Sequence, residues 1–162
     1  DPTELIKFRK DGRLDERSYQ VIRSRLKGRD RFVIPGFYGL GADGEVWTFP
    51  RDGSDVSGAV ISRGVNARIY RNLTSADGVL SADPNIVGKD KVRPLQTMTY
   101  QEYRELGNGG FKVLHRDTII PVATAGIPIN VLHSELPASV GTTISLNRPE
   151  VPGEDVIGIA GK

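Results

Sequence analysis

Three stretches of the chain combine glycine with charged or hydroxyl side chains in a way that suits anion binding. The first is Arg51-Asp52-Gly53-Ser54-Asp55, which lies between a predicted strand and a predicted helix. The start of a helix offers free backbone N–H groups and a partial positive charge. An arginine can also grip a carboxylate or a phosphate with two hydrogen bonds. The alternative is an ordinary strand–turn–helix connection in which Ser54 caps the helix.

The second stretch follows a predicted strand at Ile69. It runs from Thr74 to Val79 (Thr-Ser-Ala-Asp-Gly-Val) and continues into Ala82-Asp83-Pro84. Hydroxyl groups and a glycine at the end of a strand can hold a ribose or phosphates. The alternative is a surface turn, because Asp-Gly and Asp-Pro pairs are common turn formers.

The third stretch runs from Gly109 to His115 (Gly-Gly-Phe-Lys-Val-Leu-His). Lys112 follows a flexible glycine pair and can neutralise phosphate charge; the alternative is a solvated surface lysine. His115 is the acid–base candidate of the chain. No carboxylate pair or serine is visibly arranged with it, so we interpret it as a structural histidine.

Alternating helices and strands are predicted to position these stretches. The predicted helices begin at Asp15, at Ser54, at Thr99 (with Glu102 at capping-box spacing) and at Asp117. The predicted strands are short and apolar, at 31–34, 46–49, 67–70, 127–131 and 141–144. This alternation indicates an α/β domain with a mainly parallel sheet covered by helices. The strands near 32–34, 67–70 and 127–131 are expected to be parallel neighbours, with the Arg51 and Thr74 loops at the same edge.

Composition excludes several other classes of protein. The chain has 162 residues, 38% hydrophobic and 26% charged, which suits one globular domain. The net charge of +2 and the mixed charges from Arg9 to Arg31 argue against a nucleic-acid surface. The sequence has no cysteine and two histidines, which argues against a disulfide framework and a zinc site. No signal peptide or membrane span is evident, so a cytoplasmic protein is expected.

The order of the motifs along the chain resembles the aspartokinases. The matching stretches are 35–39 (Pro-Gly-Phe-Tyr-Gly), 51–55, 74–84, 110–115 and 126–129 (Gly-Ile-Pro-Ile). The closing Gly158-Ile159-Ala160-Gly161-Lys162 resembles the lead into the regulatory ACT domains of that family. The resemblance implies the amino-acid-kinase fold, a three-layer α/β/α sandwich. It also implies transfer of the γ-phosphoryl group of ATP to the side-chain carboxylate of L-aspartate, the first step of lysine, threonine and methionine biosynthesis.

The resemblance also implies roles for individual residues. Arg51 and Lys112 take the catalytic positions. The residues that would bind the substrate are Phe37, Arg51, Gly53, Ser54 and Asp55. The residues that would bind the nucleotide are Thr74, Ser75, Gly78, Leu80, Asn85 and Lys112. Mg²⁺ is expected to arrive with ATP rather than at a protein metal site. Phosphoryl transfer depends on positioning and charge neutralisation, so the lack of a catalytic triad is no objection.

The sequence departs from the aspartokinase pattern at several positions. Asp52, Ser75 and Asn85 stand where the family usually has glycine, aspartate and arginine, and Leu80 replaces an aromatic residue. These changes bear on nucleotide affinity and not on the fold. Lys7-Phe8 is followed by Arg9-Lys10, so the Lys-Phe-Gly-Gly phosphate loop of the family's first strand is not present.

We therefore expect residues 1–162 to form one partial domain, the C-terminal, nucleotide-binding part of the catalytic domain. The N-terminal half and the ACT domains would be absent, and the fragment would be inactive alone. Its expected partners are L-aspartate, ATP, and the missing half or another copy of the chain. Two alternatives remain: a kinase of the same fold acting on glutamate, acetylglutamate, carbamate or UMP, or a non-catalytic fragment that binds a nucleotide or a partner chain.

Overall fold

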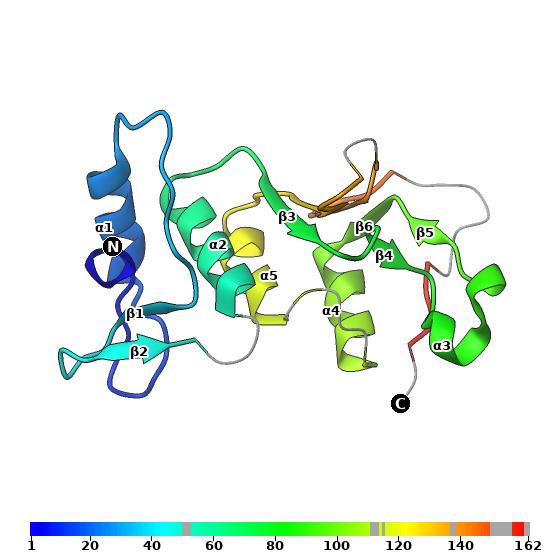
Figure 1. Ribbon diagram of the computed structural model, residues 1–162, viewed down its shortest axis with the longest axis horizontal. Coiled ribbons are helices and arrows are strands. Elements are labelled where there is room, and N and C mark those ends of the chain that lie inside the picture. The colour runs from blue at the N-terminus through cyan, green and yellow to red at the C-terminus, as the bar shows by residue number, and fades with distance from the viewer. Residues whose placement is uncertain (50–52, 111–113, 115, 137–138, 150–156, 161–162) are drawn as a thin grey trace.

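The computed structural model describes residues 1–49, 53–110, 114, 116–136, 139–149 and 157–160. The described chain is elongated, with α1 near one end of the long axis and α3 near the other (Figure 1). The helices are α1 (Arg17–Leu26), α2 (Gly53–Gly64), α3 (Pro84–Val87), α4 (Tyr100–Asn108) and α5 (Arg116–Thr124), with 3₁₀ turns at Pro2–Glu4 and Lys89–Lys91. The strands are β1 (Tyr38–Leu40), β2 (Val46–Thr48), β3 (Tyr70–Thr74), β4 (Val79–Leu80), β5 (Pro94–Leu95), β6 (Thr97–Thr99), β7 (Ile129–His133) and β8 (Thr142–Ser145).

The central sheet has four strands in the order β3-β7-β8-β6. Strand β3 runs parallel to β7, with Tyr70 opposite Ile129 and Thr74 opposite His133. Strand β6 runs parallel to β8, and β7 meets β8 in the antiparallel sense. Two of the three pairings are therefore parallel, which confirms the predicted α/β class with a mainly parallel sheet.

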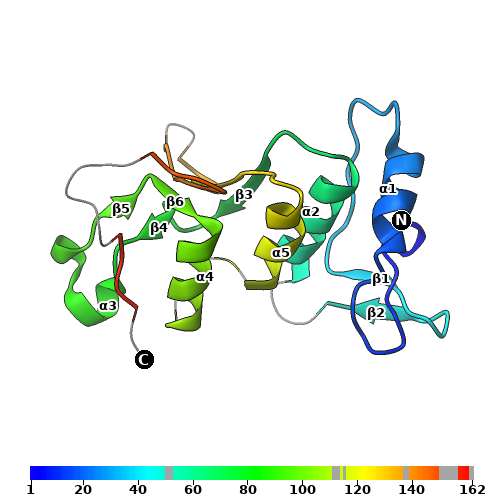
Figure 2. The ribbon, with the colours of Figure 1, turned by 180° about the vertical axis from the view of Figure 1, so that it is seen from behind.

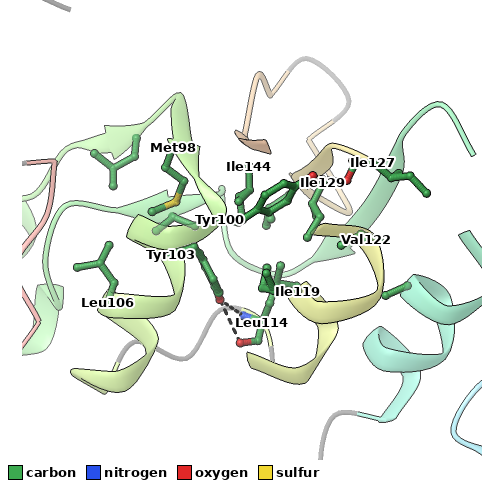
Figure 3. Packing of buried hydrophobic residues seen from close by; sticks show 14 of the residues in the cluster. Met98, Tyr100, Tyr103, Leu106, Leu114, Ile119, Val122, Ile127, Ile129 and Ile144 are labelled. Carbon is green, nitrogen blue, oxygen red and sulfur yellow. Dashed lines mark hydrogen bonds between the residues drawn. The ribbon is translucent and has the colours of Figure 1, made fainter. Parts of the chain in front are cut away.

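Helices α2, α4 and α5 lie along one face of this sheet, as both ribbon views show (Figures 1 and 2). The side chains that point to these helices alternate along the strands and are buried, among them Met98, Ile129, Val131 and Ile144. They pack with Tyr103 and other buried residues of α4 and α5 to form the larger hydrophobic core (Figure 3). Side chains on the opposite face are less covered.

A second hydrophobic core joins α1 and α2 to the N-terminal segment and to the β1–β2 hairpin. Its buried residues include Ile6, Phe8, Ile22, Phe49 and Val60. An ideal Cβ at residue 64 would lie 2.4 Å from the side chain of Ile22, so Gly64 allows α1 and α2 to approach closely. Helix α2 thus belongs to both cores and holds the two parts of the chain together.

The four predicted helices are present close to their predicted positions. Helix α1 ends just before Gly28, which has a φ of +76°. At the start of α4, the Thr99 hydroxyl accepts a hydrogen bond from the Glu102 amide, and the Glu102 carboxylate accepts one from the Thr99 amide at 2.7 Å. This is the capping box that the sequence predicts.

The strand predictions are less accurate. The predicted strand at 31–34 is wrong: these residues form no strand, and Phe32 and Val33 are exposed. The predicted strand at 67–70 begins only at Tyr70 and continues to Thr74, and the one at 127–131 begins at Ile129. The pairing of these two as parallel neighbours is confirmed, but the strand expected beside them at 32–34 does not exist.

Candidate functional site

The start of α2 contacts β3 at Tyr70 and Asn72. The Asn72 amide nitrogen lies 2.9 Å from Oδ1 of Asp55, and the Tyr70 hydroxyl donates to the Asp55 carbonyl at 3.1 Å. Asn72 is two residues before Thr74, where the predicted nucleotide loop begins. Arg51 lies outside the described residues, so the prediction that the Arg51 and Thr74 loops share one edge stays a prediction.

Gly53, the first residue of α2, packs closely against Phe37 and Phe49. An ideal Cβ at residue 53 would lie 2.7 Å from the Phe37 ring and 2.6 Å from the Phe49 Cβ, so only glycine fits there. Phe37 has a φ of +85°, which is unusual for a bulky residue and marks a constrained position. Its amide donates to the Ser57 hydroxyl at 2.7 Å, and that hydroxyl donates to the Gly53 carbonyl at 2.6 Å.

Ser54 is exposed and Asp55 is half-buried on the first turn of α2. The 35–39 stretch lies against this turn, since an ideal Cβ at Gly36 would be 3.3 Å from the Ser54 Cα. The structure therefore brings together four predicted substrate-binding residues: Phe37, Gly53, Ser54 and Asp55. Arg51 and Asp52, from the same motif, lie outside the described residues.

The predicted nucleotide loop begins at the last residue of β3. The Thr74 carbonyl accepts a hydrogen bond from the Ser134 amide at 2.8 Å, and Ser75 is exposed. The Asp77 carboxylate accepts a hydrogen bond from the Ser139 hydroxyl, which ties the loop to the connection between β7 and β8. The loop is thus anchored at its base and presents Ser75 to solvent.

Gly78 lies where the loop turns back into the fold. It has a φ of +80°, and an ideal Cβ there would lie 2.5 Å from the Thr142 hydroxyl oxygen. That hydroxyl accepts from the Val79 amide at 2.7 Å and donates to the Leu95 carbonyl at 2.5 Å. Conformation and space both require glycine at position 78, and buried Thr142 fixes the path of the chain after it.

Leu80 and Asn85 lie further along the same segment. Leu80 is half-buried in β4, opposite Pro94 of β5. Asn85 is exposed on α3, where its amide donates to the capping carboxylate of Asp83 at 2.8 Å. Helix α3 lies towards the end of the long axis away from α1 (Figure 1), so Asn85 is separated from the first turn of α2.

The third predicted stretch is described only in part. Lys112 and His115 lie outside the described residues. Leu114, between them, is buried, and its amide and carbonyl lie 2.6 and 3.0 Å from the Tyr103 hydroxyl (Figure 3). Tyr103 therefore anchors the chain at Leu114, two residues after Lys112.

Two tyrosines from different elements, Tyr70 of β3 and Tyr103 of α4, have raised pKa values, and the charge of Asp55 contributes to both. Burial raises the pKa of Tyr70 to about 12, against the lowering effect of its hydrogen bond with Asn72, and the Asp55 carboxylate adds to the rise. Burial also raises the pKa of Tyr103 to about 12, against the lowering effect of its hydrogen bond with the Leu114 backbone. The Asp55 carboxylate again adds to the rise. Both phenols are therefore neutral at physiological pH; Tyr70 donates to the Asp55 carbonyl and Tyr103 to the Leu114 carbonyl.

No group of three or more histidine, aspartate or glutamate side chains placed to hold a metal ion occurs within the described ranges. The described helices also include none long and apolar enough to cross a membrane.

The chemistry that the arrangement offers is anion and amino-acid recognition. It combines a helix start, a carboxylate fixed by neutral donors, and a hydroxyl-bearing loop at the end of a parallel strand.

Four residues of this arrangement were not predicted from the sequence: Tyr70, Asn72, Tyr103 and Thr142. Asn72, Tyr103 and Thr142 are buried polar side chains, and Tyr70 is half-buried. A polar residue at a helix-facing position of a strand is the available signal, and Asn72 and Thr142 both carry it once the strand boundaries are known.

Comparison with known proteins identifies the family. Residues 1–133 match the model of the amino acid kinase family, which is well over half of the chain. The chain belongs to the amino acid kinase family. Its fold and the order of its motifs agree with this assignment, and the resemblance predicted from the sequence is confirmed.

Within the amino acid kinase family, the chain is similar to aspartokinases. It is 40% identical to Aspartokinase 3 of Bacillus subtilis (strain 168) over 144 residues, which are 88% of this chain and 31% of that protein. Its structure matches the aspartate kinase of Clostridium acetobutylicum with a TM-score of 0.89 and 42% identity, over 99% of this chain and 37% of that one.

A third similar protein is E. coli aspartokinase III, solved in complex with aspartate and ADP. The TM-score is 0.81 at 25% identity, and the match covers 91% of this chain and 34% of that chain. The chain therefore spans about a third of the length of the relatives that it matches.

Proposed function

We propose that the chain is the nucleotide-side part of the catalytic domain of an aspartate kinase. The reaction is transfer of the γ-phosphoryl group of Mg-ATP to the side-chain carboxylate of L-aspartate. The observation that carries this proposal is the structural match to an aspartate kinase over 99% of the chain, at 42% identity. A match of this extent includes the predicted site stretches as well as the scaffold.

The described part of the site supports the proposal. Gly53, Ser54 and Asp55 form a helix start beside the constrained Phe37, and Asp55 contacts Asn72, two residues before the Thr74 loop. We propose that Arg51 and the first turn of α2 hold the aspartate substrate. We propose that Thr74, Ser75, Gly78, Leu80, Asn85 and Lys112 face the nucleotide. Mg²⁺ would enter as part of the Mg-ATP substrate.

The proposed chemistry needs no nucleophilic side chain from the protein. The attacking atom is a carboxylate oxygen of the substrate; it forms a bond to the γ-phosphorus while the bond to the bridging oxygen of ADP breaks. The protein must hold the two anions in line and offset their charges. The products are an acyl phosphate and ADP.

The test is a panel of acceptors with the complete polypeptide encoded by the gene that contains this chain. ADP release is measured with Mg-ATP and, in turn, aspartate, glutamate, acetylglutamate, carbamate and UMP. Turnover with aspartate at least about a hundredfold above the others, in kcat/KM, is the expected result. Preference for any other acceptor would replace aspartate in the proposal, and no turnover with any of them would favour the non-catalytic alternative.

A further inference from the structure

Asn72 is a buried amide on a face of the sheet where most of the buried side chains are apolar. It lies on the helix-facing side of β3 and is only 6% exposed. In the register of the sheet it lies opposite the buried Val131 of β7, which in turn lies opposite the buried Thr142 of β8. A buried amide costs free energy unless its hydrogen bonds are made. The partners of Asn72 therefore indicate what the residue does.

The Asn72 amide donates two hydrogen bonds, and both involve the proposed substrate site. Its Nδ2 donates to the Asp55 Oδ1 at 2.9 Å and to the Tyr70 hydroxyl at 3.2 Å. The same Tyr70 hydroxyl donates to the Asp55 carbonyl at 3.1 Å. Asp55 is thus held through its side chain and its backbone by two neutral groups of β3.

Gly58 of α2 leaves room for the Tyr70 hydroxyl. An ideal Cβ at residue 58 would lie 2.6 Å from the Tyr70 hydroxyl oxygen, so Gly58 lets the phenol reach the helix backbone. Tyr70 is half-buried there. The tyrosine, the asparagine and the glycine act together, because the loss of any one removes or displaces a donor to Asp55.

We propose that Asn72, supported by Tyr70, is a positioning residue that holds the Asp55 carboxylate in a fixed orientation within the proposed substrate site. This inference rests on the proposed function. An amide is suited to the task because it fixes a carboxylate by hydrogen bonding without cancelling its charge. A lysine or arginine at position 72 would instead form an ion pair with Asp55 and offset its charge.

The test compares two substitutions of Asn72 in the complete polypeptide. Asn72→Leu keeps the approximate volume and removes the donor. Asn72→Asp keeps the shape and places a second carboxylate against Asp55. Because a hydrogen bond to a charged group contributes enough to change binding about tenfold or more, each should raise the KM for aspartate by at least about that factor. The KM for ATP should stay within about twofold of wild type, since the substitution does not reach the nucleotide loop.

Asn130→Asp is the matched control. Asn130 is a half-buried asparagine on the adjacent strand β7, facing the other side of the sheet, and its amide donates to the Thr143 hydroxyl at 3.3 Å. It carries the same chemical change without contact with Asp55, so its KM for aspartate should remain close to wild type. Tyr70→Phe should raise the KM for aspartate by a smaller factor, about threefold, as expected for one neutral hydrogen bond.

The outcomes separate the two proposals. An active wild-type enzyme whose Asn72 variants keep the wild-type KM for aspartate overturns the positioning role alone. An equal rise in the KM for aspartate and for ATP, or an equal effect of Asn130→Asp, also overturns it, because it indicates a general structural change. If the Asn72 variants do not fold, Tyr70→Phe decides by the same criteria. A wild-type protein without aspartate-dependent turnover overturns the proposed function, and the positioning role with it.

Discussion

Asp55 lies where two elements meet: its own helix α2, and strand β3 through Tyr70 and Asn72. The sequence predicted that Asp55 begins a helix, because a serine and an aspartate follow a glycine after a strand. It could not predict Asn72 as its partner. A single asparagine in a strand has no local pattern that reveals which helix lies across from it.

A substitution at Ser75 tests the proposed contact between the Thr74 loop and the nucleotide. It is exposed at the end of β3, so a larger side chain has room there. Aspartokinases usually carry aspartate at this position, and a carboxylate can accept a hydrogen bond from a sugar hydroxyl. Ser75→Asp in the complete polypeptide is expected to tighten ATP binding or raise turnover, measured by calorimetry and steady-state kinetics. Unchanged affinity and rate would show that the loop contacts the nucleotide in another way.

The charge of Asp15 is expected to make the stability of the N-terminal part of the fold depend on pH. Its carboxylate accepts hydrogen bonds from the Arg17 Nε and from the Arg17 amide, both at 2.9 Å, and these bonds hold its pKa at about 2. A pKa lowered in the folded state stabilises the fold above the ordinary pKa near 3.8. That contribution is lost as the pH falls towards 2.

The matching experiment follows hydrogen exchange of the α1 amides in wild type and Asp15→Asn. The variant should exchange faster than wild type at pH 6, and the difference should shrink as the pH approaches 2. A difference of the same size at both pH values would contradict a charge-dependent role for Asp15.

At the scale of elements, capping and periodicity predicted the helices, whereas strand boundaries depended on pairing. The start of α4 was predicted from Thr99 and Glu102 because the capping box is a local interaction. The apolar run at 31–34 has strand-like composition, but no described strand pairs with it and Val33 is 96% exposed. Whether an apolar run finds a partner strand depends on residues distant in the sequence, which a local pattern does not contain.

Tyr103 connects helix α4 to the stretch that carries Lys112. Its hydroxyl both accepts from and donates to the Leu114 backbone, and Tyr103→Phe keeps the ring in the core while removing both bonds. The free energy of unfolding should fall by about 1–3 kcal/mol, because Leu114 is buried and loses its partner. Since Leu114 follows Lys112 by two residues, the KM for ATP should rise more than the KM for aspartate.

Tyr100→Phe is the control for that prediction. Tyr100 is on the same helix, and its hydroxyl donates to the Ile127 carbonyl at 2.6 Å, away from the 109–115 stretch. It should lower the free energy of unfolding without changing the KM for ATP. Equal kinetic effects of the two variants would indicate that both act only through the stability of α4.

At the scale of the whole molecule, the order of five weak motifs predicted the family better than any one of them. Each of the motifs also occurs as an ordinary turn. Five in one order, on alternating helices and strands, are far less common by chance, and the family match over residues 1–133 confirms the interpretation.

The sheet also has a poorly covered face, on which Leu73 is 64% exposed. The sequence pattern alone did not predict which face would be covered.

The isolated 162-residue chain is expected to lack aspartate kinase activity. The transferring phosphoryl group needs cations and backbone donors on several sides, and the chain has no Lys-Phe-Gly-Gly phosphate loop. ADP release by the purified chain with aspartate and Mg-ATP should stay at background. A rate within about a hundredfold of an intact family member would mean that the chain completes the site alone or in a dimer, since loss of several such donors costs more than that.

The most direct measurement is chemical trapping of the product of the complete polypeptide. An acyl phosphate reacts with hydroxylamine, so wild type with Mg-ATP and aspartate should yield β-aspartyl hydroxamate. Arg51→Ala should lower kcat/KM for aspartate by about a hundredfold or more, because a bidentate charged contact is lost. Arg71→Ala, which removes an exposed arginine of β3, should leave the rate unchanged. Absence of the hydroxamate from wild type, or equal rates for wild type and Arg51→Ala, would contradict the assignment of an aspartate kinase site to this chain.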